Sequence, residues 1–159
     1  MAEIERKWLV ERPPDDLSAY PSRQIDQGYL AIDSDGTEVR VRRADGDAVM
    51  TINQGAGRTR AEEEFSIPGD RFERLWPLTA NRRVQKRRYR IPGPDGLMFE
   101  LDRYGGDHEG LVVVEAEFPD ERSAQSFTAP AWFGREVTDD AHYKNQNLAQ
   151  EHANPSEDP

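Results

Sequence analysis

The chain opens with an alternation of charged and apolar residues that is suited to binding a metal-bound phosphate. Residues 3–7 read Glu-Ile-Glu-Arg-Lys. In an extended strand alternate side chains share a face, so Glu3, Glu5 and Lys7 project to one side and the residues between them to the other. Two carboxylates can bind a hard cation, and the ammonium can bind an anion that the cation carries. The spacing therefore favours phosphate chemistry, provided that other strands repeat the pattern.

The elements that must position these residues are mostly strands. Alternating apolar and polar residues, bounded by Gly, Pro, Asn and Asp, recur along the chain. They predict strands over residues 2–10, 25–32, 37–43, 48–54, 59–67, 84–91, 97–104 and 111–118. Turn-forming connectors such as Asp33-Ser34-Asp35-Gly36 indicate antiparallel neighbours. Helices are expected at about 69–76 and 119–127, and a third is expected to begin near residues 138–140.

Sorting the predicted strands by parity separates their charges from their apolar residues. One face collects nearly all the charged residues, and the other collects most of the large apolar ones, such as Trp8 and Phe99. The basic members of the charged face are Lys7, Arg40, Arg42, Arg60, Lys86, Arg88 and Arg90. Its acidic members are Glu3, Glu5, Glu38, Glu62, Glu64, Glu100, Asp102, Glu115 and Glu117.

Two folds explain this separation. An antiparallel sheet with one solvated face does so on periodicity alone. A closed barrel also explains why Val112-Val113-Val114, which is typical of a buried strand, leads directly into Glu115. Charges inside a barrel must pair or hold ions, because isolated buried charge is costly. The second fold would have its apolar residues outside, covered by helices, and its charges lining an interior wide enough for a polar ligand.

The charged face has the composition of a site for a small polyanion. Guanidinium groups clamp phosphoryl oxygens, and their origin on several separate strands suits several phosphates better than an extended nucleic acid. The carboxylates would repel such an anion unless Mg²⁺ or Mn²⁺ intervened. Metals that bridge phosphate oxygens also activate water for in-line attack. Ordinary ion pairs between neighbouring strands remain an alternative for individual pairs.

Composition excludes several classes of function. The chain of 159 residues is long enough for one domain with its own core. Its net charge of −10 argues against binding to nucleic acid or to an anionic membrane. It contains no Cys, which excludes disulfides and zinc–thiolate sites. It has no apolar run long enough to span a membrane and no signal peptide, so we expect a cytoplasmic protein.

The order of the motifs resembles that of CYTH-domain proteins, also called triphosphate tunnel metalloenzymes, especially the small single-domain bacterial members. The signature of that family is Glu-x-Glu-x-Lys near the N-terminus, matched here by residues 3–7. The further matches are Gln27-Gly28-Tyr29-Leu30, Val39-Arg40-Val41-Arg42, Arg60-x-Glu62-x-Glu64, Lys86-x-Arg88, Asp102, Glu115-x-Glu117 and Trp132-x-Gly134-x-Glu136-Val137-Thr138, followed by Tyr143. The resemblance implies the second of the two folds, of the α+β class: a closed eight-stranded antiparallel β-barrel, or tunnel, with a polar charged interior and helices packed outside. It implies one CYTH domain over residues 1–149. Residues 150–159 are expected to form a disordered tail.

The resemblance also implies roles for individual residues in a tunnel that binds triphosphates with Mg²⁺ or Mn²⁺. The implied metal ligands are Glu3, Glu5, Glu62, Glu64, Asp102, Glu115 and Glu117. The implied substrate-binding residues are Lys7, Arg40, Arg42, Arg60, Lys86, Arg88 and Lys144. Lys7 and Tyr29 are the implied catalytic residues.

One position departs from the pattern. The family commonly has Thr-x-Lys on the fourth strand, where this chain has Thr51-Ile52-Asn53. Losing an inward ammonium removes one phosphate contact, which weakens binding by a few kcal/mol if that contact is buried. Arg58 and Arg60 are the candidates to replace it.

These observations favour a metal-dependent hydrolase of inorganic tripolyphosphate. The expected partner is this small-molecule substrate, with neither nucleic acid nor membrane, and the protein is expected to be a monomer or homodimer. Thiamine or nucleoside triphosphatase activity and adenylate cyclase activity remain alternatives on the same site. Asn53 keeps open a non-catalytic binder of polyphosphate or nucleotide. A purely structural barrel is disfavoured by the ordered motifs.

Overall fold

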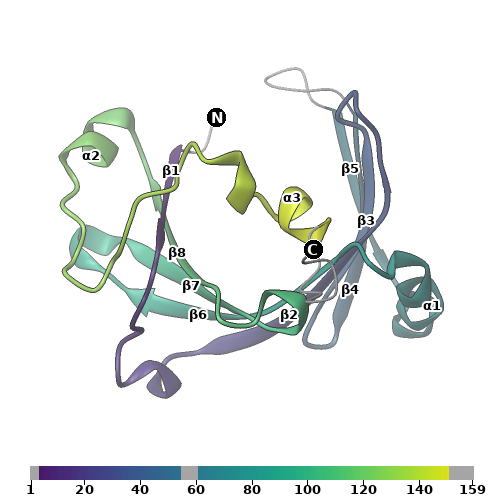
Figure 1. Ribbon diagram of the computed structural model, residues 1–159, viewed down its shortest axis with the longest axis horizontal. Helices are drawn as coiled ribbons and strands as arrows, with labels where there is room; N and C mark the ends of the chain where they lie inside the picture. The colour runs from purple at the N-terminus through teal and green to yellow at the C-terminus, as the bar shows by residue number, and fades with distance from the viewer. Residues whose placement is uncertain (1–3, 55–60, 151–159) are drawn as a thin grey trace, which may run out of the picture.

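The computed structural model describes residues 4–54 and 61–150. Its strands form one antiparallel eight-stranded sheet, in the order β1-β8-β7-β6-β2-β3-β4-β5 (Figure 1). The strands are β1 (Ile4–Leu9), β2 (Ser22–Ile32), β3 (Glu38–Ala44), β4 (Asp47–Gln54), β5 (Ala61–Ile67), β6 (Arg83–Pro92), β7 (Met98–Tyr104) and β8 (Val112–Phe118). The eight predicted strands and the predicted α+β class are confirmed.

Short helices connect the strands. The α-helices are α1 (Gly69–Leu75), α2 (Glu121–Ser126) and α3 (Asn145–Ala149), and the 3-10 helices are η1 (Leu17–Ala19), η3 (Trp76–Thr79), η4 (Pro94–Gly96), η5 (Gly106–His108) and η6 (Ala141–Tyr143). The helices predicted near 69–76 and 119–127 are confirmed. The third was wrongly predicted as one continuous helix, because Lys144 has extended backbone (φ −72°, ψ 139°) between η6 and α3.

The sheet is strongly curved and open. In residues 4–54 and 61–150 the edge strands β1 and β5 are not paired with each other. Figure 1 shows the sheet bent into a trough, with β1 on one wall and β5 on the other. Closure into a barrel therefore stays a prediction. We call the inner side of this trough the concave face.

Strand register confirms that the charges share one face. Paired residues on neighbouring antiparallel strands point to the same side of a sheet. Lys7 pairs with Glu115, and Glu115 pairs with Glu100 on its other side. Further along the sheet, Arg88 pairs with Asp102. All these side chains therefore belong to the concave face.

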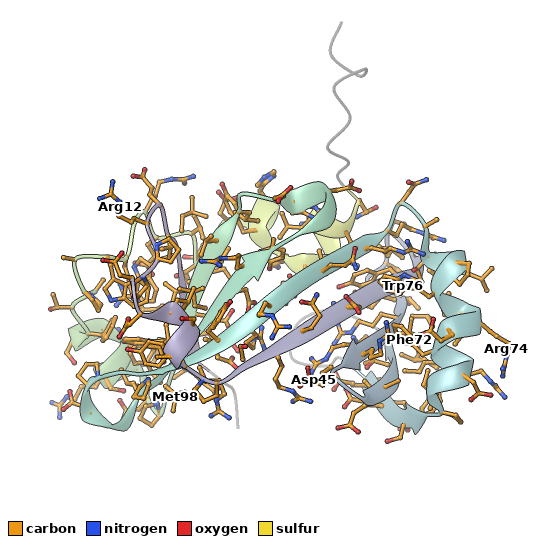
Figure 2. All side chains as sticks on the ribbon, turned by 90° about the horizontal axis from the view of Figure 1, so that it is seen from below. Arg12, Asp45, Phe72, Arg74, Trp76 and Met98 are labelled. Carbon is orange, nitrogen blue, oxygen red and sulfur yellow. The ribbon has the colours of Figure 1, made fainter. Side chains whose placement is uncertain are left out.

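The opposite, convex face carries the apolar core. Trp8, Leu101 and Val114 are buried there, in a cluster that α2 and the chain after it cover. A second cluster places Phe72 of α1 against Val41 and Ala48. Figure 2 shows α1 lying alongside one end of the sheet, with Phe72 turned towards the strands.

Helix α3 departs from the expectation that helices pack outside. It lies in the trough, against the concave face (Figure 1). Leu148 of α3 packs with Val84, Tyr104 and Val113, which share the concave face with the charged residues. The physical reason is that this end of the concave face is apolar, so burying it requires a cover inside the trough.

Some predictions concern residues outside the described part of the chain. They are the roles of Glu3, Arg58 and Arg60, and the disorder predicted for residues 151–159. Within the described part, no helix combines the length and apolar character needed to cross a membrane.

Candidate functional site

The strongest electrostatic feature of the concave face is a buried cluster on β6 and β7. Asp102 receives hydrogen bonds from Arg88 Nε at 2.8 Å and Arg88 Nη2 at 2.9 Å, and its Oδ2 lies 2.9 Å from Lys86 Nζ. The side chains of Lys86 and Asp102 are 4% and 11% exposed, so this ion pair is largely desolvated. Burial favours the neutral form of Asp102, but the charges of Lys86 and Arg88 outweigh it and lower the Asp102 pKa. Asp102 is therefore the counterion of Lys86 and Arg88.

Lys7 is positioned by β1 and by the chain that follows α2. The Lys7 backbone N–H donates to Thr138 Oγ1 at 3.0 Å, and the neighbouring Arg6 forms an ion pair with Glu136 at 2.7 Å. The Lys7 ammonium donates to the Tyr143 carbonyl at 3.2 Å and lies 3.8 Å from Glu115 Oε2. The motif around Glu136 and Thr138 thus holds the strand that presents Lys7 to the concave face.

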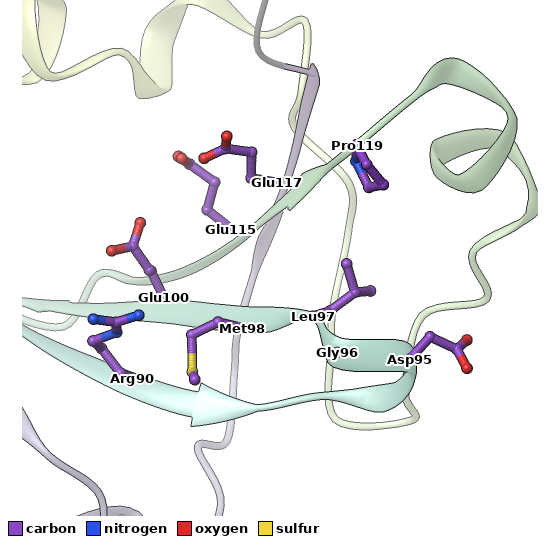
Figure 3. A pocket seen from close by; sticks show the side chains of 9 residues that line it. All are labelled: Arg90, Asp95, Gly96, Leu97, Met98, Glu100, Glu115, Glu117 and Pro119. Carbon is purple, nitrogen blue, oxygen red and sulfur yellow. The ribbon is translucent and has the colours of Figure 1, made fainter.

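Carboxylates of β7 and β8 line a cavity of about 410 Å³ beside this ammonium. Glu100, Glu115 and Glu117 project into it from one side of the trough, and Arg90 lies below Glu100 (Figure 3). Glu5 joins the same region because it pairs with Glu117 in the β1–β8 ladder.

The predicted metal ligands are not all brought together. Glu62 and Glu64 lie on β5, at the opposite edge of the sheet from Glu5 and Glu117. Asp102 is occupied by its two cations. Within residues 4–54 and 61–150 no three carboxylates or histidines form a group able to hold a metal. The remaining carboxylates still fit Mg²⁺ chemically, because Mg²⁺ uses oxygen ligands and commonly takes only one or two carboxylates beside water and substrate phosphate.

The other half of the concave face is basic. Arg40 and Arg42 come from β3, and Arg40 Nη1 bonds to Glu38 Oε1 at 2.8 Å. The Asn53 amide donates to the same Glu38 oxygen at 2.8 Å. Glu38 is 3% exposed and anchors both residues. Glu38 was not predicted as a site residue, although strand parity places it on the charged face; register then pairs it with Asn53.

Two further predicted residues lie apart from this set. Tyr29 is 1% exposed and lies under α3. Its hydroxyl accepts a hydrogen bond from Gln27 Nε2 at 2.9 Å. Burial raises the pKa of this hydroxyl. In the described part of the chain it makes no hydrogen bond to Lys7. The side chain of Lys144 is exposed just before α3.

Among the predicted site residues, the structure brings together the cations of β1, β3 and β6 and the carboxylates of β7 and β8.

Comparison with known proteins finds two curated relatives that span nearly the whole chain. An inorganic triphosphatase from Nitrosomonas europaea is 47% identical over 150 residues, covering 94% of this chain and 97% of the relative. An inorganic triphosphatase from Acetivibrio thermocellus is 38% identical over 152 residues, covering 92% of each chain. No protein-family model matches the sequence.

Solved structures agree with the sequence relatives. A crystal structure of an inorganic triphosphatase superposes with a TM-score of 0.84 at 42% identity, covering 97% of this chain and 98% of the other. A protein from Hippeastrum superposes with a TM-score of 0.57 at 14% identity, over 78% of this chain and 83% of the other, which shows a shared fold alone. By its identity to the two curated relatives over nearly its full length, this chain belongs to the inorganic triphosphatase family.

Proposed function

We propose that this protein hydrolyses inorganic triphosphate in a CYTH-type tunnel formed by the concave face. The observation that carries the proposal is the division of this face into cations on β3 and β6 and carboxylates on β7 and β8. A triphosphate needs cations along its oxygens, and carboxylates can hold the metal ions that accompany it. The names of the two curated relatives support the same activity.

The basic half would bind and orient the substrate. Arg40 and Arg88 are held by carboxylates at 2.8 Å, which fixes their guanidinium groups before any ligand arrives. Such preorganised cations stabilise charge on phosphoryl oxygens without reorganising during the reaction. Lys7 lies 3.8 Å from Glu115 on the neighbouring strand, where it can contact a phosphoryl oxygen next to the acidic half.

The acidic half would hold Mg²⁺ or Mn²⁺, with Glu5, Glu115 and Glu117 as the proposed ligands among the described residues. Such an ion, when bound, polarises phosphoryl oxygens and lowers the pKa of a coordinated water. The proposed tunnel also requires the β5 edge to approach β1, which would bring Glu62 and Glu64 towards the same space.

The proposal is tested by phosphate release from tripolyphosphate, ATP and thiamine triphosphate, each with Mg²⁺, Mn²⁺ or EDTA. We expect metal-dependent turnover that is fastest on tripolyphosphate and falls by about 100-fold or more in Glu115→Gln, by analogy with the loss of an electrostatic catalytic group. Glu109→Gln, on an exposed turn, is the matched control and should retain full activity. Binding without turnover would replace the hydrolase by a non-catalytic binder, and cyclic AMP formed from ATP would replace it by a cyclase.

A further inference from the structure

The Lys7 ammonium is held by a main-chain carbonyl of the C-terminal segment (residues 140–149). It donates a hydrogen bond to the Tyr143 carbonyl at 3.2 Å and lies 3.8 Å from Glu115 Oε2. Tyr29, the other residue that the resemblance implies as catalytic, is buried and makes no hydrogen bond to Lys7 in the described part of the chain. The Lys7 side chain is 24% exposed, so a ligand in the trough can still reach it.

We propose that the main-chain carbonyl of Tyr143 is a positioning group for Lys7, which aims the ammonium at a phosphoryl oxygen of the substrate. The carbonyl contacts Lys7 and not the substrate. The inference rests on the proposed function and adds to it a contact that no sequence motif indicates, because every residue type carries a main-chain carbonyl.

The carbonyl is available because the helical backbone is interrupted at Lys144. In a continuous α-helix the Tyr143 carbonyl would accept from the N–H of Asn147, four residues later. Lys144 has extended backbone instead, and the Asn147 N–H donates to the Lys144 carbonyl at 2.9 Å. In the described part of the chain, no main-chain N–H donates to the Tyr143 carbonyl. The break between η6 and α3 thus leaves this oxygen for Lys7.

Contacts on both sides of the break fix the position of the carbonyl. The Asn147 amide of α3 donates to the Ala141 carbonyl of η6 at 2.6 Å, which ties the two helices together. Tyr104 of β7 donates to Asn145 Oδ1 at 2.8 Å, and Leu148 is buried against the sheet. Figure 1 shows the segment running from the β1 wall into the trough. The carbonyl therefore belongs to a docked segment.

A carbonyl suits this task because it is an acceptor without net charge. An ammonium has three donors at the end of a flexible side chain, so it has no fixed direction by itself. The Tyr143 carbonyl fixes one donor and Glu115 attracts a second, which leaves the third for a ligand. Glu115 is also a proposed metal ligand, and a bound ion would draw its charge away from Lys7. The neutral carbonyl keeps its bond to Lys7 in either case and so orients the ammonium before the substrate arrives.

The test replaces the amide between Tyr143 and Lys144 by an ester. An ester carbonyl is a weaker hydrogen-bond acceptor than an amide carbonyl, and the replacement keeps every side chain. Since the chain contains no Cys, residues 129–159 can be ligated as a synthetic peptide through a temporary cysteine in place of Ala129, which is then desulfurised to alanine. The full-length protein made by the same ligation with all amides intact is the reference.

An ester one residue earlier is the matched control. The test ester also removes the Lys144 N–H, which donates to the Ala141 carbonyl at 3.1 Å. The control ester removes the Tyr143 N–H, which donates to the Asp140 carbonyl at 3.1 Å, and leaves the Tyr143 carbonyl an amide. The two proteins therefore lose equivalent hydrogen bonds within η6 and differ in the acceptor offered to Lys7.

We expect the test ester to raise KM for tripolyphosphate about fivefold, as for the weakening of one hydrogen bond, with kcat changed by about twofold at most. The loss falls on KM because the ammonium contacts the phosphoryl oxygen in both the ground state and the transition state. The control ester should leave KM and kcat within about twofold of the reference. A lower melting temperature of the test ester with unchanged KM would make the carbonyl purely structural and overturn the proposal.

Calorimetric titration with tripolyphosphate in EDTA tests the contact without turnover. The test ester should weaken binding about fivefold in the wild-type sequence and by less than about twofold in Lys7→Met, because its effect passes through the ammonium. An equal loss in Lys7→Met overturns the positioning role. Absence of turnover with this dependence on Lys7 intact overturns the proposed hydrolysis and leaves the positioning role standing.

Asn147→Ala gives a second test by ordinary expression. It removes the bond to the Ala141 carbonyl, which loosens η6 from α3, and should weaken binding of tripolyphosphate about threefold. Gln150→Ala, the matched control, removes a bond from another side-chain amide, to the Gln146 carbonyl at 3.3 Å, and should leave binding unchanged. This pair decides the question where an ester does not refold: equal binding by the two variants then overturns the proposal.

Discussion

The charged residues of the concave face have different roles, which depend on whether another charged residue is paired with them. Asp102 is enclosed by Lys86 and Arg88, so it compensates buried charge within the protein. Glu115 and Glu117 face an open cavity instead. Arg42 and Arg90 border a second cavity without an ion-pair partner among the described residues. Glu115, Glu117, Arg42 and Arg90 therefore border space that a ligand can enter, whereas Asp102 is enclosed by protein cations.

Replacing Asp102 should destabilise the protein. Asp102→Asn leaves the ammonium of Lys86, which is 4% exposed, without its carboxylate. Breaking a buried pair in this way costs several kcal/mol, and we expect the free energy of unfolding at pH 7 to fall by about 3 kcal/mol. Chemical denaturation measures the change. Asp47→Asn, whose side chain is 91% exposed, should change it by no more than about 0.5 kcal/mol.

The stability that Asp102 contributes should also depend on pH. Its pKa is lowered in the folded state, so the stabilisation is complete above the unfolded-state pKa of about 3.9. It is lost as the pH falls from there through the lower pKa of the folded state. Denaturation curves of the wild-type protein and Asp102→Asn should therefore converge on acidification below about pH 4. A difference that stays constant down to pH 2 would contradict this assignment.

Replacing Asn53 tests whether the lysine that the family commonly has at this position of β4 would contact the substrate. The Asn53 side chain is fully buried beside Glu38, and its Oδ1 has no hydrogen-bond partner in the described part of the chain. Asn53→Lys would add a cation next to Glu38, and we expect about fivefold tighter binding of tripolyphosphate, since Glu38 takes part of the gain. Asn53→Met controls for side-chain length. Unchanged binding in Asn53→Lys would show that this position does not contact the substrate.

At the scale of elements, close approach between β2 and η3 requires a glycine in β2. A Cβ on Gly28 would lie 2.5 Å from the Cβ of Thr79 and 2.8 Å from its Cγ2. Thr79 is fully buried, and its hydroxyl donates to the Trp76 carbonyl at 2.7 Å, so it has no room to move aside. The glycine of the Gln27-Gly28-Tyr29 motif thus allows η3 to pack against the sheet.

Gly28→Ala should therefore lower the melting temperature. The overpacking costs about 1–3 kcal/mol, because either β2 or η3 must shift. Gly46→Ala is the matched control: no atom lies within 4 Å of its added Cβ, and we expect a change of about 0.5 kcal/mol or less. Equal melting temperatures for the two variants would show that η3 moves without cost.

At the scale of the whole molecule, α3 joins the C-terminal part of the chain to the middle of the sheet. Leu148 is 1% exposed and packs with Tyr29, Val84 and Tyr104, which come from three different strands. Tyr104 also donates to Asn145 Oδ1 at 2.8 Å. These contacts close one end of the trough.

Leu148→Ala should destabilise the whole protein. Truncating a leucine in a packed core costs about 2–5 kcal/mol, through lost burial and the cavity left behind. Leu78→Ala makes the same chemical change at a residue 61% exposed, so it should alter the free energy of unfolding by about 0.5 kcal/mol or less. If the two variants were equally stable, α3 would not be part of the cooperative core.

The sequence by itself determined the strands and the face to which each charge belongs. Alternation is a local property: within each extended strand, parity separates the charged residues from the apolar ones, and burial of the apolar face leaves Lys7, Arg88 and Glu115 on the other face. The order of the motifs was likewise enough to indicate triphosphate hydrolysis, which agrees with the names of the two curated relatives. Most of the correct predictions thus depended on the position of a residue within its strand.

Only the tertiary structure decided which of these charges meet. Strand order placed Glu64 at the opposite edge of the sheet from Glu117. The register of β6 and β7 placed Asp102 in ion pairs with Lys86 and Arg88. The curvature of the sheet and the docking of α3 inside it are set by contacts between residues far apart in the chain. Local periodicity carries no information about such contacts, because alternation repeats every two residues whatever strand lies alongside.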